Sequence, residues 1–521
     1  MLHRTNIKES EIRRVSYLIN DNSIITAIMK RSAIIIAAAL LLSGGMKAQN
    51  ADDALRYSQI FYTGSARFMS MGGAFTALGG DMSTFSQNPA GIGVFRSSEI
   101  SVTPQLLHAK ASAGFNGIND DYLYNFNLGQ AGVVGNLIKG NGTTGLISLN
   151  FGYAYNKTNN LNSSTRIQGN SLTSSMADSW ADDGYGVYYG DLAGAAGIAY
   201  DAWIIDTITG SGARYYGTVF SNYGDNPSSE YGQNIRRLIN NEGYTAEHAI
   251  TIGGNYSNKV YFGATLGINT IRYTGHFEHL ERADYLLDSQ FSDFTYVEHF
   301  ENTGTGINLK IGAIIRPIEQ LRIGLAFHSP TLYKIDERFY DNISSNFTDG
   351  GHYEFYNEDV VYEYALTSPF RALAGVAYQI EKAGLISVDY EFVDYSTLKF
   401  SETGDGYDYG EKNLMLKSTL KPVHNVRVGG ELRFNKLYFR GGYGYYGKVF
   451  AESEVNRDFF NRSVSAGIGF REQNLSIDFG FTNLRNEQKY VLYDSYYDTP
   501  MADLINNRNM FSVTFGYKFG F

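Results

Sequence analysis

The sequence has no cysteine, few prolines and no apolar run long enough to cross a bilayer as a helix. The absence of cysteine from 521 residues excludes disulfides, thiolate catalysis and thiolate metal sites. The longest apolar run, residues 33–42, is too short for a spanning helix. A mean hydropathy of −0.25 excludes a helical membrane bundle. The net charge of −10 argues against nucleic acid as a partner. Gly-x-Ser-x-Gly and His-Glu-x-x-His motifs are also missing, so we predict neither an enzyme nor a cofactor.

The beginning of the chain has the pattern of a secretion signal. Lys30 and Arg31 precede the apolar run, and small residues then lead to Ala48. We predict a signal peptide over residues 29–48, with cleavage after Ala48, and interpret residues 1–28 as a mis-annotated extension. The alternative is an uncleaved anchor helix, which the short apolar run disfavours.

The residues in excess favour β structure. The chain has 57 glycines, 41 tyrosines and 33 phenylalanines. In "LRIGLAFHS", Leu321, Ile323, Leu325 and Phe327 share one face, and more polar residues share the other. This period of two indicates a strand with one apolar face, and a length of about ten residues suits a tilted membrane strand. We expect fourteen such strands, near residues 98–112, 124–135, 143–156, 247–256, 259–273, 303–316, 320–331, 368–379, 384–394, 423–434, 436–447, 463–472, 474–485 and 508–521.

The connections between these segments alternate between short turns and long loops. Outer-membrane barrels have this asymmetry, with short periplasmic turns and longer surface loops. We therefore predict an all-β fold: a 14-stranded antiparallel transmembrane β-barrel over residues 98–521. The largest extracellular loop, 157–246, is expected to fold as a cap with short helices in "SSMADSWADDG" and "QNIRRLINNEG". The aromatic last strand, ending in Phe521, resembles the signal read by the barrel-assembly machinery.

Residues 49–97 precede the first strand and are rich in small residues. Such a composition permits close backbone packing in a crowded space, so we expect this segment to fold inside the lumen as a hatch. Asn88 and Pro89 predict a turn within it. Asn88, Pro89, Ala90 and Gly91 are our candidates for a gate.

The hatch sequence "GSARFMSMGGAFTALGGDMSTFSQNPAGIGVF" resembles that of the FadL/TodX-type outer-membrane transporters of hydrophobic compounds. The segments "GAIIRPIEQLRIGLAFHSPT", "ISVDYEFVDYS" and "VRVGGELRFNKLYFRGGYGYYG" resemble later strands of that family. The resemblance implies a fourteen-stranded barrel with a lumenal plug. Within the family, the sequence is similar overall to the Bacteroidetes branch, whose members are often labelled hemin receptors. The chain departs from the family pattern at Gly80, at Gln87 and in the 157–246 insertion.

Several polar residues of the predicted strands are expected to face the lumen. They guide an anionic head group or, as we favour, form ion pairs that brace the wall. These candidates are Lys310, Arg322, Asp389, Glu391, Arg427, Glu431, Arg433, Arg440 and Asp478. A metal or haem site at His276, His279 and His299 is the less favoured reading, because residues three apart on a strand face opposite ways. The "GYGYYG" run, Gly442–Gly447, lies within a strand, so we interpret its glycines as space for lumenal packing.

The resemblance implies passive uptake of hydrophobic compounds, such as long-chain fatty acids or aromatic hydrocarbons, across the outer membrane of a Gram-negative bacterium. The expected partners are a hydrophobic small molecule, outer-membrane lipid and the assembly machinery. Two alternatives remain: a shuttle in surface-protein secretion and a haem-binding receptor.

Overall fold

The computed structural model describes residues 51–519, apart from 141–142, 171, 209, 222–230, 286, 288, 405 and 496–497. The predicted signal peptide and Phe521 lie outside the described residues. Within them, no helix has the length and apolarity needed to cross a membrane.

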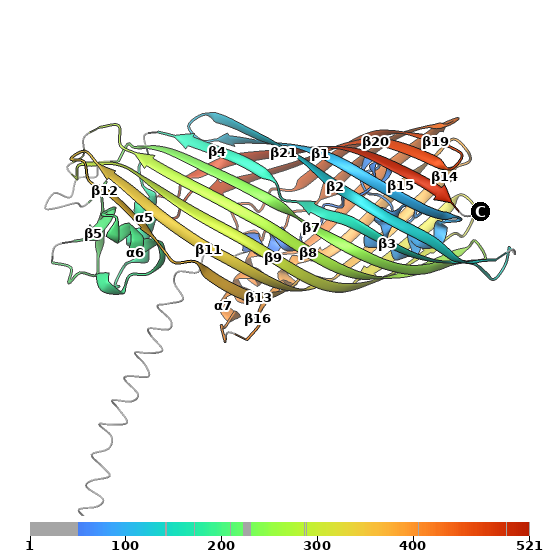
Figure 1. Cartoon of the computed structure of the whole chain (residues 1–521), viewed down its shortest axis with the longest axis horizontal. Helices are drawn as coiled ribbons and strands as arrows, with labels where there is room; N and C mark the ends of the chain where they lie inside the picture. Colours follow the sequence, from blue (N-terminus) through green and yellow to red (C-terminus); the bar gives the residue numbers. More distant parts are fainter. Residues whose placement is uncertain are drawn as a thin grey trace, which may run out of the picture.

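The chain forms a closed antiparallel barrel of fourteen strands, as the period of two predicts (Figure 1). Neighbouring strands pair in chain order, and the last strand pairs with the first, from Ser98↔Phe519 to Gly114↔Asp503. Closure leaves no exposed sheet edge at this seam. The barrel strands are β1 (Ser98–Gly114), β2 (Ile118–Lys139), β3 (Leu146–Asn160), β7 (Asn234–Tyr256), β8 (Val260–Arg282), β9 (Phe291–Ile315), β10 (Leu321–His328), β14 (Arg371–Ile380), β15 (Gly384–Asp394), β17 (Pro422–Phe434), β18 (Leu437–Tyr446), β19 (Asn461–Glu472), β20 (Leu475–Val491) and β21 (Met501–Phe519).

Further strands extend the barrel wall toward the end opposite the short turns. The strands β4, β11, β13 and β16 follow or precede β3, β10, β14 and β15 along the chain, and β12 pairs with β11. Their bounds are β4 (Ser163–Gly169), β11 (Leu332–Phe347), β12 (His352–Tyr356), β13 (Val360–Thr367) and β16 (Lys399–Glu402). Helix η5 (Tyr395–Thr397) lies before β16, and α7 (Gly410–Thr419) lies after it. Many of the strands, such as β2, β7, β8 and β9, are therefore longer than expected, and several predicted loops contain paired strands.

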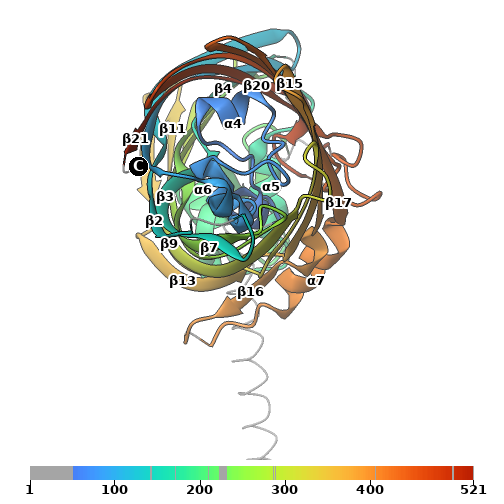
Figure 2. The ribbon, with the colours of Figure 1, turned by 90° about the vertical axis from the view of Figure 1, so that its right-hand side faces the viewer.

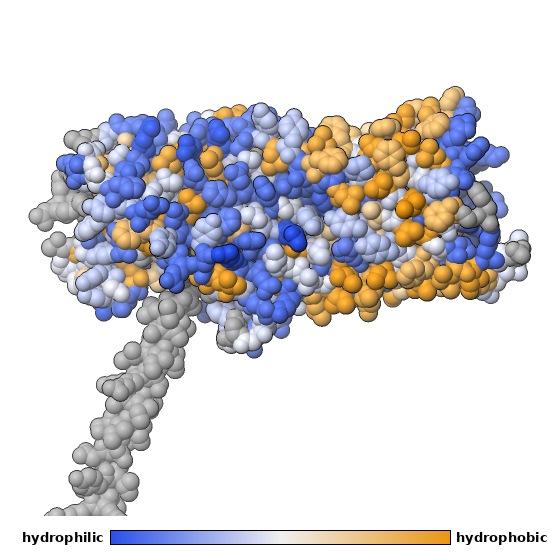
Figure 3. Space-filling model, in the orientation of Figure 1, coloured by the Kyte–Doolittle hydropathy of each residue, from blue (hydrophilic) through white to orange (hydrophobic). Residues whose placement is uncertain are grey.

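The wall is apolar outside and polar inside, the reverse of a soluble sheet protein. On β17, Val426, Val428 and Leu432 are exposed, whereas Arg427 and Glu431 are buried. Apolar side chains gather over one half of the visible face, the half that carries the short turns, and the other half is hydrophilic (Figure 3). This apolar belt suits the hydrocarbon of a bilayer, and the polar half extends beyond it.

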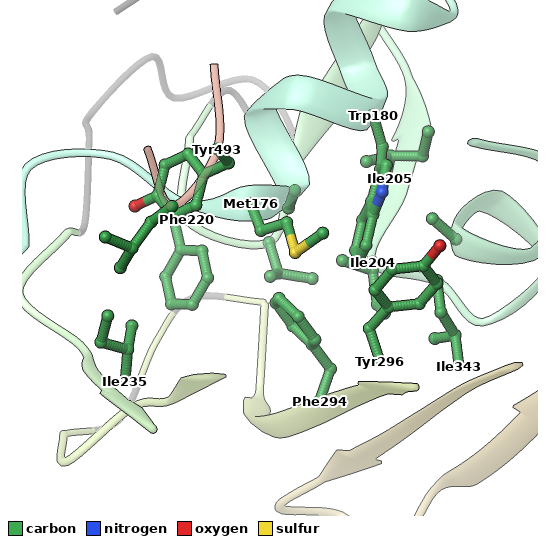
Figure 4. Packing of buried hydrophobic residues seen from close by; sticks show 14 of the residues in the cluster. Met176, Trp180, Ile204, Ile205, Phe220, Ile235, Phe294, Tyr296, Ile343 and Tyr493 are labelled. Carbon is green, nitrogen blue, oxygen red and sulfur yellow. The ribbon is translucent and has the colours of Figure 1, made fainter. Parts of the chain in front are cut away.

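A folded cap fills the end of the barrel opposite the short turns. It contains α5 (Met176–Asp183), η4 (Tyr189–Asp191), α6 (Gly194–Asp201) and the hairpin of β5 (Ile205–Thr207) and β6 (Tyr216–Thr218). Trp180 of α5 is buried against Phe294 and Tyr296 of β9 (Figure 4). The helix predicted in "SSMADSWADDG" is thus confirmed. The helix predicted in "QNIRRLINNEG" is wrong, because these residues are the start of β7, where Ile235 and Arg237 face inward and pair with β8.

The N-terminal segment lies inside the barrel (Figure 2). Helix α3 (Ala51–Ser58) packs against lumenal tyrosines such as Tyr273 and Tyr364. The hatch proper follows, with α4 (Ala66–Ser70), η2 (Met82–Ser86) and η3 (Pro89–Val94). Nearly every residue from 62 to 95 is buried. The segment is therefore a lumenal plug, as its small residues suggested.

Candidate functional site: hatch, lumen cavity and wall window

The predicted gate residues form a capped turn that joins the hatch to the wall. The Asn88 side chain accepts a hydrogen bond from the Ala90 N–H at 3.1 Å, and Pro89 occupies the first turn of η3. The Asn88 amide also donates to the Thr76 carbonyl at 2.6 Å and to the Ala313 carbonyl of β9 at 3.4 Å. One side chain thus stabilises the turn, the rest of the hatch and the contact with the wall. A gating role for Asn88–Gly91 stays a prediction.

Glycines in the wall give the hatch its space. A Cβ at Gly312 would overlap the Asn88 side chain, and a Cβ at Gly324 would overlap the Thr76 carbonyl. Gly442, from the "GYGYYG" run, meets the backbone of Gly72 in the same way. Other wall glycines with backbone or side-chain atoms of the hatch at this range are Gly263, Gly429 and Gly467. Hatch and wall are therefore in van der Waals contact around the barrel.

The largest group of predicted lumen charges forms an ion-pair chain that ends on the hatch. Arg67 of the hatch binds Glu431 at 3.0 Å, and Glu431 also binds Arg440 at 2.6 Å. Arg440 binds Asp478 at 2.7 Å. All four side chains are largely buried, so each charge needs its partner. Arg433 differs from the others, since it is exposed at the periplasmic end of β17.

The remaining candidates contact other parts of the hatch or form ion pairs within the wall. Asp389 accepts hydrogen bonds from the Thr76 N–H at 2.8 Å and from its hydroxyl at 2.7 Å. Arg322 donates to the Leu78 carbonyl at 2.7 Å. Glu391 lies between Arg371 and Arg427, with both ion pairs at 2.6 Å, and Arg371 also donates to the Ser58 carbonyl. Lys310 pairs with Glu247 on the neighbouring wall.

The three histidines do not converge. His279 is fully buried, where it contacts Glu281 at 2.9 Å and Arg237 at 3.2 Å. His276 and His299 are cross-strand partners on β8 and β9, with ring centroids 6.4 Å apart. Among the described residues, no cluster of three potential metal ligands occurs. A metal or haem site at these residues has no geometric support.

The wall is interrupted between β2 and β3. Their ladder runs from Lys139↔Ser148 to Gln130↔Asn156 and stops there, although β2 continues to Ile118 in register with β1. β3 pairs with β7 along its whole length, and above this point β3 and β4 keep only that ladder on the β7 side. We call this gap the window. It lies between residues 118–129 of β2 and residues 157–163, which join the end of β3 to the start of β4.

The hatch replaces the missing strand partner on the inner side of the window. The Phe61 N–H donates to the Thr158 carbonyl at 3.1 Å, and the Thr63 hydroxyl donates to the Lys157 carbonyl at 2.6 Å. Residues 156–160 of β3 and the next two residues are all buried, consistent with a strand turned toward the lumen. An unpaired backbone in hydrocarbon is costly, so this substitution stabilises the break.

Few side-chain contacts cross the window. The Lys157 ammonium donates to the Asn127 side chain at 2.8 Å, and just beyond the window the Ser164 hydroxyl of β4 donates to Asp121 at 2.9 Å. Outside, Phe126 and Leu128 of the β2 edge are exposed, the former by 76%. Through β1, Phe126 aligns with Leu106 and Phe511, which are exposed residues of the apolar belt.

A cavity of about 590 Å³ lies behind the window. Asn159, Leu161 and Ser163 of the inward-turned stave line it, together with Arg56 and Phe61 of the N-terminal segment. Its other walls combine aromatic residues and asparagines with charged side chains: Phe277, Phe300, Phe450, Phe460, Asn241, Asn302, Asn461, Asn486, Asn506, Asp52, Asp53, Glu298, Glu337, Glu487, Lys489 and Arg508. Its volume falls in the range of small-molecule sites, and its surface suits an apolar molecule with a hydrogen-bonding group.

Sequence reasoning missed both the window and the cavity. One signal was present: the period of two fails in "NKTNNLN", Asn156–Asn162, where polar residues occupy both faces. Another is Gly129, the bulge at which the β1–β2 register shifts. Neither signal identifies which neighbour a strand loses, because strand pairing joins distant parts of the chain.

Comparisons with known proteins support the fold. No protein-family model matches the sequence, and the search of curated proteins found no match. A FadL homologue from Pseudomonas aeruginosa is similar in structure, with a TM-score of 0.54 and 12% identity over 89% of this chain and all of that one. A deltaS2 mutant of the TodX monoaromatic hydrocarbon channel gives 0.52 and 12%, covering 88% and 99%. The Pseudomonas putida toluene transporter TodX gives 0.50 and 11%, covering 89% and 100%.

Proposed function

We propose that this protein is a passive channel for hydrophobic compounds in the outer membrane of a Gram-negative bacterium. In this proposal a compound enters at the extracellular end, occupies the lumen cavity and leaves sideways through the window. The structural neighbours include a toluene transporter and a monoaromatic hydrocarbon channel, which supports this class of cargo. Long-chain fatty acids and aromatic hydrocarbons are the compounds we would test first.

The observation that carries the proposal is the window, together with the hatch, which blocks the path from the lumen to the periplasmic end. Wall glycines, the Arg67–Glu431 pair and Asn88 fix the hatch across the periplasmic end. The window, by contrast, has few cross-contacts and adjoins both the cavity and the apolar belt. An apolar molecule that moves sideways into lipid avoids water, which favours this path by about 25 cal/mol per Å² of apolar surface.

The lining of the cavity favours apolar molecules that carry a polar group over purely apolar ones. Aromatic residues such as Phe277 and Phe300 would contact the apolar part, and asparagine amides would bind a hydroxyl, carbonyl or carboxylate. Several of these amides also have partners in the protein, such as Asn302 with Tyr57 and Glu337, so a polar group of the cargo would add to an existing hydrogen-bond network.

An uptake comparison tests the function. Cells that lack their own channel of this type, with and without this protein, are given a labelled long-chain fatty acid, toluene or a disaccharide. We expect the protein to raise uptake of the fatty acid or toluene severalfold and to leave disaccharide uptake unchanged. Equal gains for all three would indicate a water-filled pore. No gain for any, with loss of secreted surface proteins from a deletion strain, would favour the secretion shuttle.

A further inference from the structure

A second cavity, of about 270 Å³, lies at the periplasmic end of the barrel, on the far side of the hatch from the lumen cavity. Its lining comes from the hatch, at residues 78–80 and 94–97, and from strand ends on different sides of the wall, including β1, β10, β15 and β21. The cavity is therefore a vestibule in which hatch and wall face one another.

The charge of this vestibule is opposite to that of the chain. The whole protein has a net charge of −10, whereas the vestibule is lined by four basic side chains and one carboxylate. The basic residues are Arg67, Arg96, Arg322 and Lys518, and the carboxylate is Glu99. A concave surface lined by one sign of charge concentrates ions of the other sign.

Three of these cations lack a carboxylate partner. Arg67 is taken by Glu431. Arg96 donates to the Asn258 side chain at 2.6 Å, and Arg322 donates to the Leu78 carbonyl at 2.7 Å. Across the part of the chain that the structure describes, neither these two arginines nor Lys518 has a carboxylate oxygen within ion-pair distance. Their mutual repulsion is only partly offset, because Glu99, the cross-strand partner of Lys518, is the one carboxylate in the lining.

We propose that the vestibule binds a small oxyanion, a phosphate or carboxylate group, between Arg96 of the hatch and Arg322 and Lys518 of the wall. Guanidinium groups bind such anions by paired N–H donors, and charge-assisted hydrogen bonds are the stronger kind. The volume is below that of a typical drug-sized site, so it fits a single head group. An anion bound here links the hatch to the wall and stabilises the hatch in the position described above.

Binding of inorganic phosphate to the purified barrel tests this site. The affinity for phosphate is measured by calorimetry, and the stability of the hatch by hydrogen exchange of residues 82–97. Both measurements are repeated with chloride at the same ionic strength. The wild type should bind phosphate and exchange more slowly in the hatch. The double variant Arg96→Gln, Lys518→Gln should bind at least about tenfold more weakly and lose the protection. Lys382→Gln, at an exposed periplasmic turn outside the vestibule, is the matched control and should behave as wild type.

The source of the anion is distinguished by the lipid. If a lipid phosphate occupies the site, nanodiscs that contain an anionic phospholipid should weaken the response to free phosphate in the wild type, compared with zwitterionic nanodiscs. If free phosphate is the ligand, the response should be the same in both. Heat-dependent gel mobility confirms that each variant is a folded barrel. Equal effects of phosphate and chloride on the wild type, or unchanged phosphate binding by the folded double variant, would overturn the proposal.

Discussion

At the scale of single residues, Gly312 of the wall and Asn88 of the hatch fit together. The Asn88 side chain occupies the volume that a Cβ at Gly312 would need. From that position it donates to the Thr76 and Ala313 carbonyls. The glycine therefore matters for the absence of a side chain, and the asparagine for three hydrogen bonds made from one site.

Replacing Gly312 by valine should displace the hatch without unfolding the barrel. Overpacking of this kind costs about 1–3 kcal/mol, and the hatch is easier to move than a strand paired on both sides. We expect faster hydrogen exchange across residues 82–94, with unchanged heat-dependent gel mobility. Gly441→Val is the control, because the nearest heavy atom to a Cβ there, the Ser465 carbonyl oxygen, is 3.9 Å away. Equal exchange in both variants would contradict the close contact described above.

The alternation of apolar and polar residues along the strands predicted many of the charged residues that line the lumen. The lumen charges were expected to form ion pairs, and Glu431, Arg440 and Asp478 do so. Arg433 shares their face in the sequence pattern, yet it is exposed near the strand end. Periodicity assigns a face but not a height along the barrel, so it cannot tell a lumenal residue from one beyond the last turn.

At the scale of elements, the cap depends on the N-terminus of α5. The Ser175 hydroxyl accepts from the Ala177 N–H at 3.0 Å and donates to Glu281 at 2.7 Å. Glu281 also accepts from the Met176 N–H at 2.8 Å. A buried carboxylate of the wall thus caps a helix that belongs to the extracellular insertion.

Ser175→Ala should destabilise the cap while the barrel stays intact. The loss of an N-cap side chain costs about 1 kcal/mol, and here a hydrogen bond to a buried carboxylate is lost as well. We expect faster hydrogen exchange in residues 176–183. Ser453→Ala, in an exposed loop, should leave that exchange unchanged. Unaltered α5 exchange in the Ser175 variant would show that the helix is held by its hydrophobic packing alone.

The cap should also respond to pH through Asp178. Burial raises the pKa of this carboxyl to about 6, although it accepts hydrogen bonds from the Ser175 N–H and the Tyr231 hydroxyl. Because the folded pKa is above the ordinary value, protonation stabilises the cap. This stability is complete at low pH and is lost as the pH rises through about 6.

Trp180 fluorescence can follow this response in a Trp203→Phe background, since the chain has two tryptophans. The urea midpoint for exposure of Trp180 should be higher at pH 5 than at pH 7.5. Asp178→Asn, which cannot ionise, should reduce that difference. A midpoint that rises with pH in the parent protein would contradict the stated direction.

The sequence predicted barrel strands better than their extensions, for a physical reason. Lipid requires an apolar outer face, so the period of two is clear within the belt. Above the belt both faces of a strand meet polar surroundings. On β11, Lys334 and Asp336 face outward while Glu337 faces inward, and the pattern is lost. The start of β7 was mistaken for a helix for the same reason.

At the scale of the whole molecule, two folded units occupy the barrel. The cap fills the end that carries the long loops, and the N-terminal segment lies in the lumen toward the end with the short turns (Figures 1 and 2). The lumen cavity is lined by the N-terminal segment and the wall. The fourteen strands and the lumenal hatch were predictable, because each strand and the small-residue segment carry a local signal. The window was not, since it arises from a register between strands that one sequence does not reveal.

Cross-linking the window measures the lateral path most directly. The chain has no cysteine, so Asn127→Cys and Lys157→Cys give a single pair of thiols at positions whose native side chains meet at 2.8 Å. Thr274→Cys with Glu301→Cys, register partners on β8 and β9, is the control pair in an intact part of the wall. A cleavable bis-methanethiosulfonate reagent joins either pair in cells that take up a labelled fatty acid or toluene. We predict that uptake through the window pair falls to the level of cells without the protein and returns after reduction, while the control pair is unaffected. Full uptake through a cross-linked window would contradict the account.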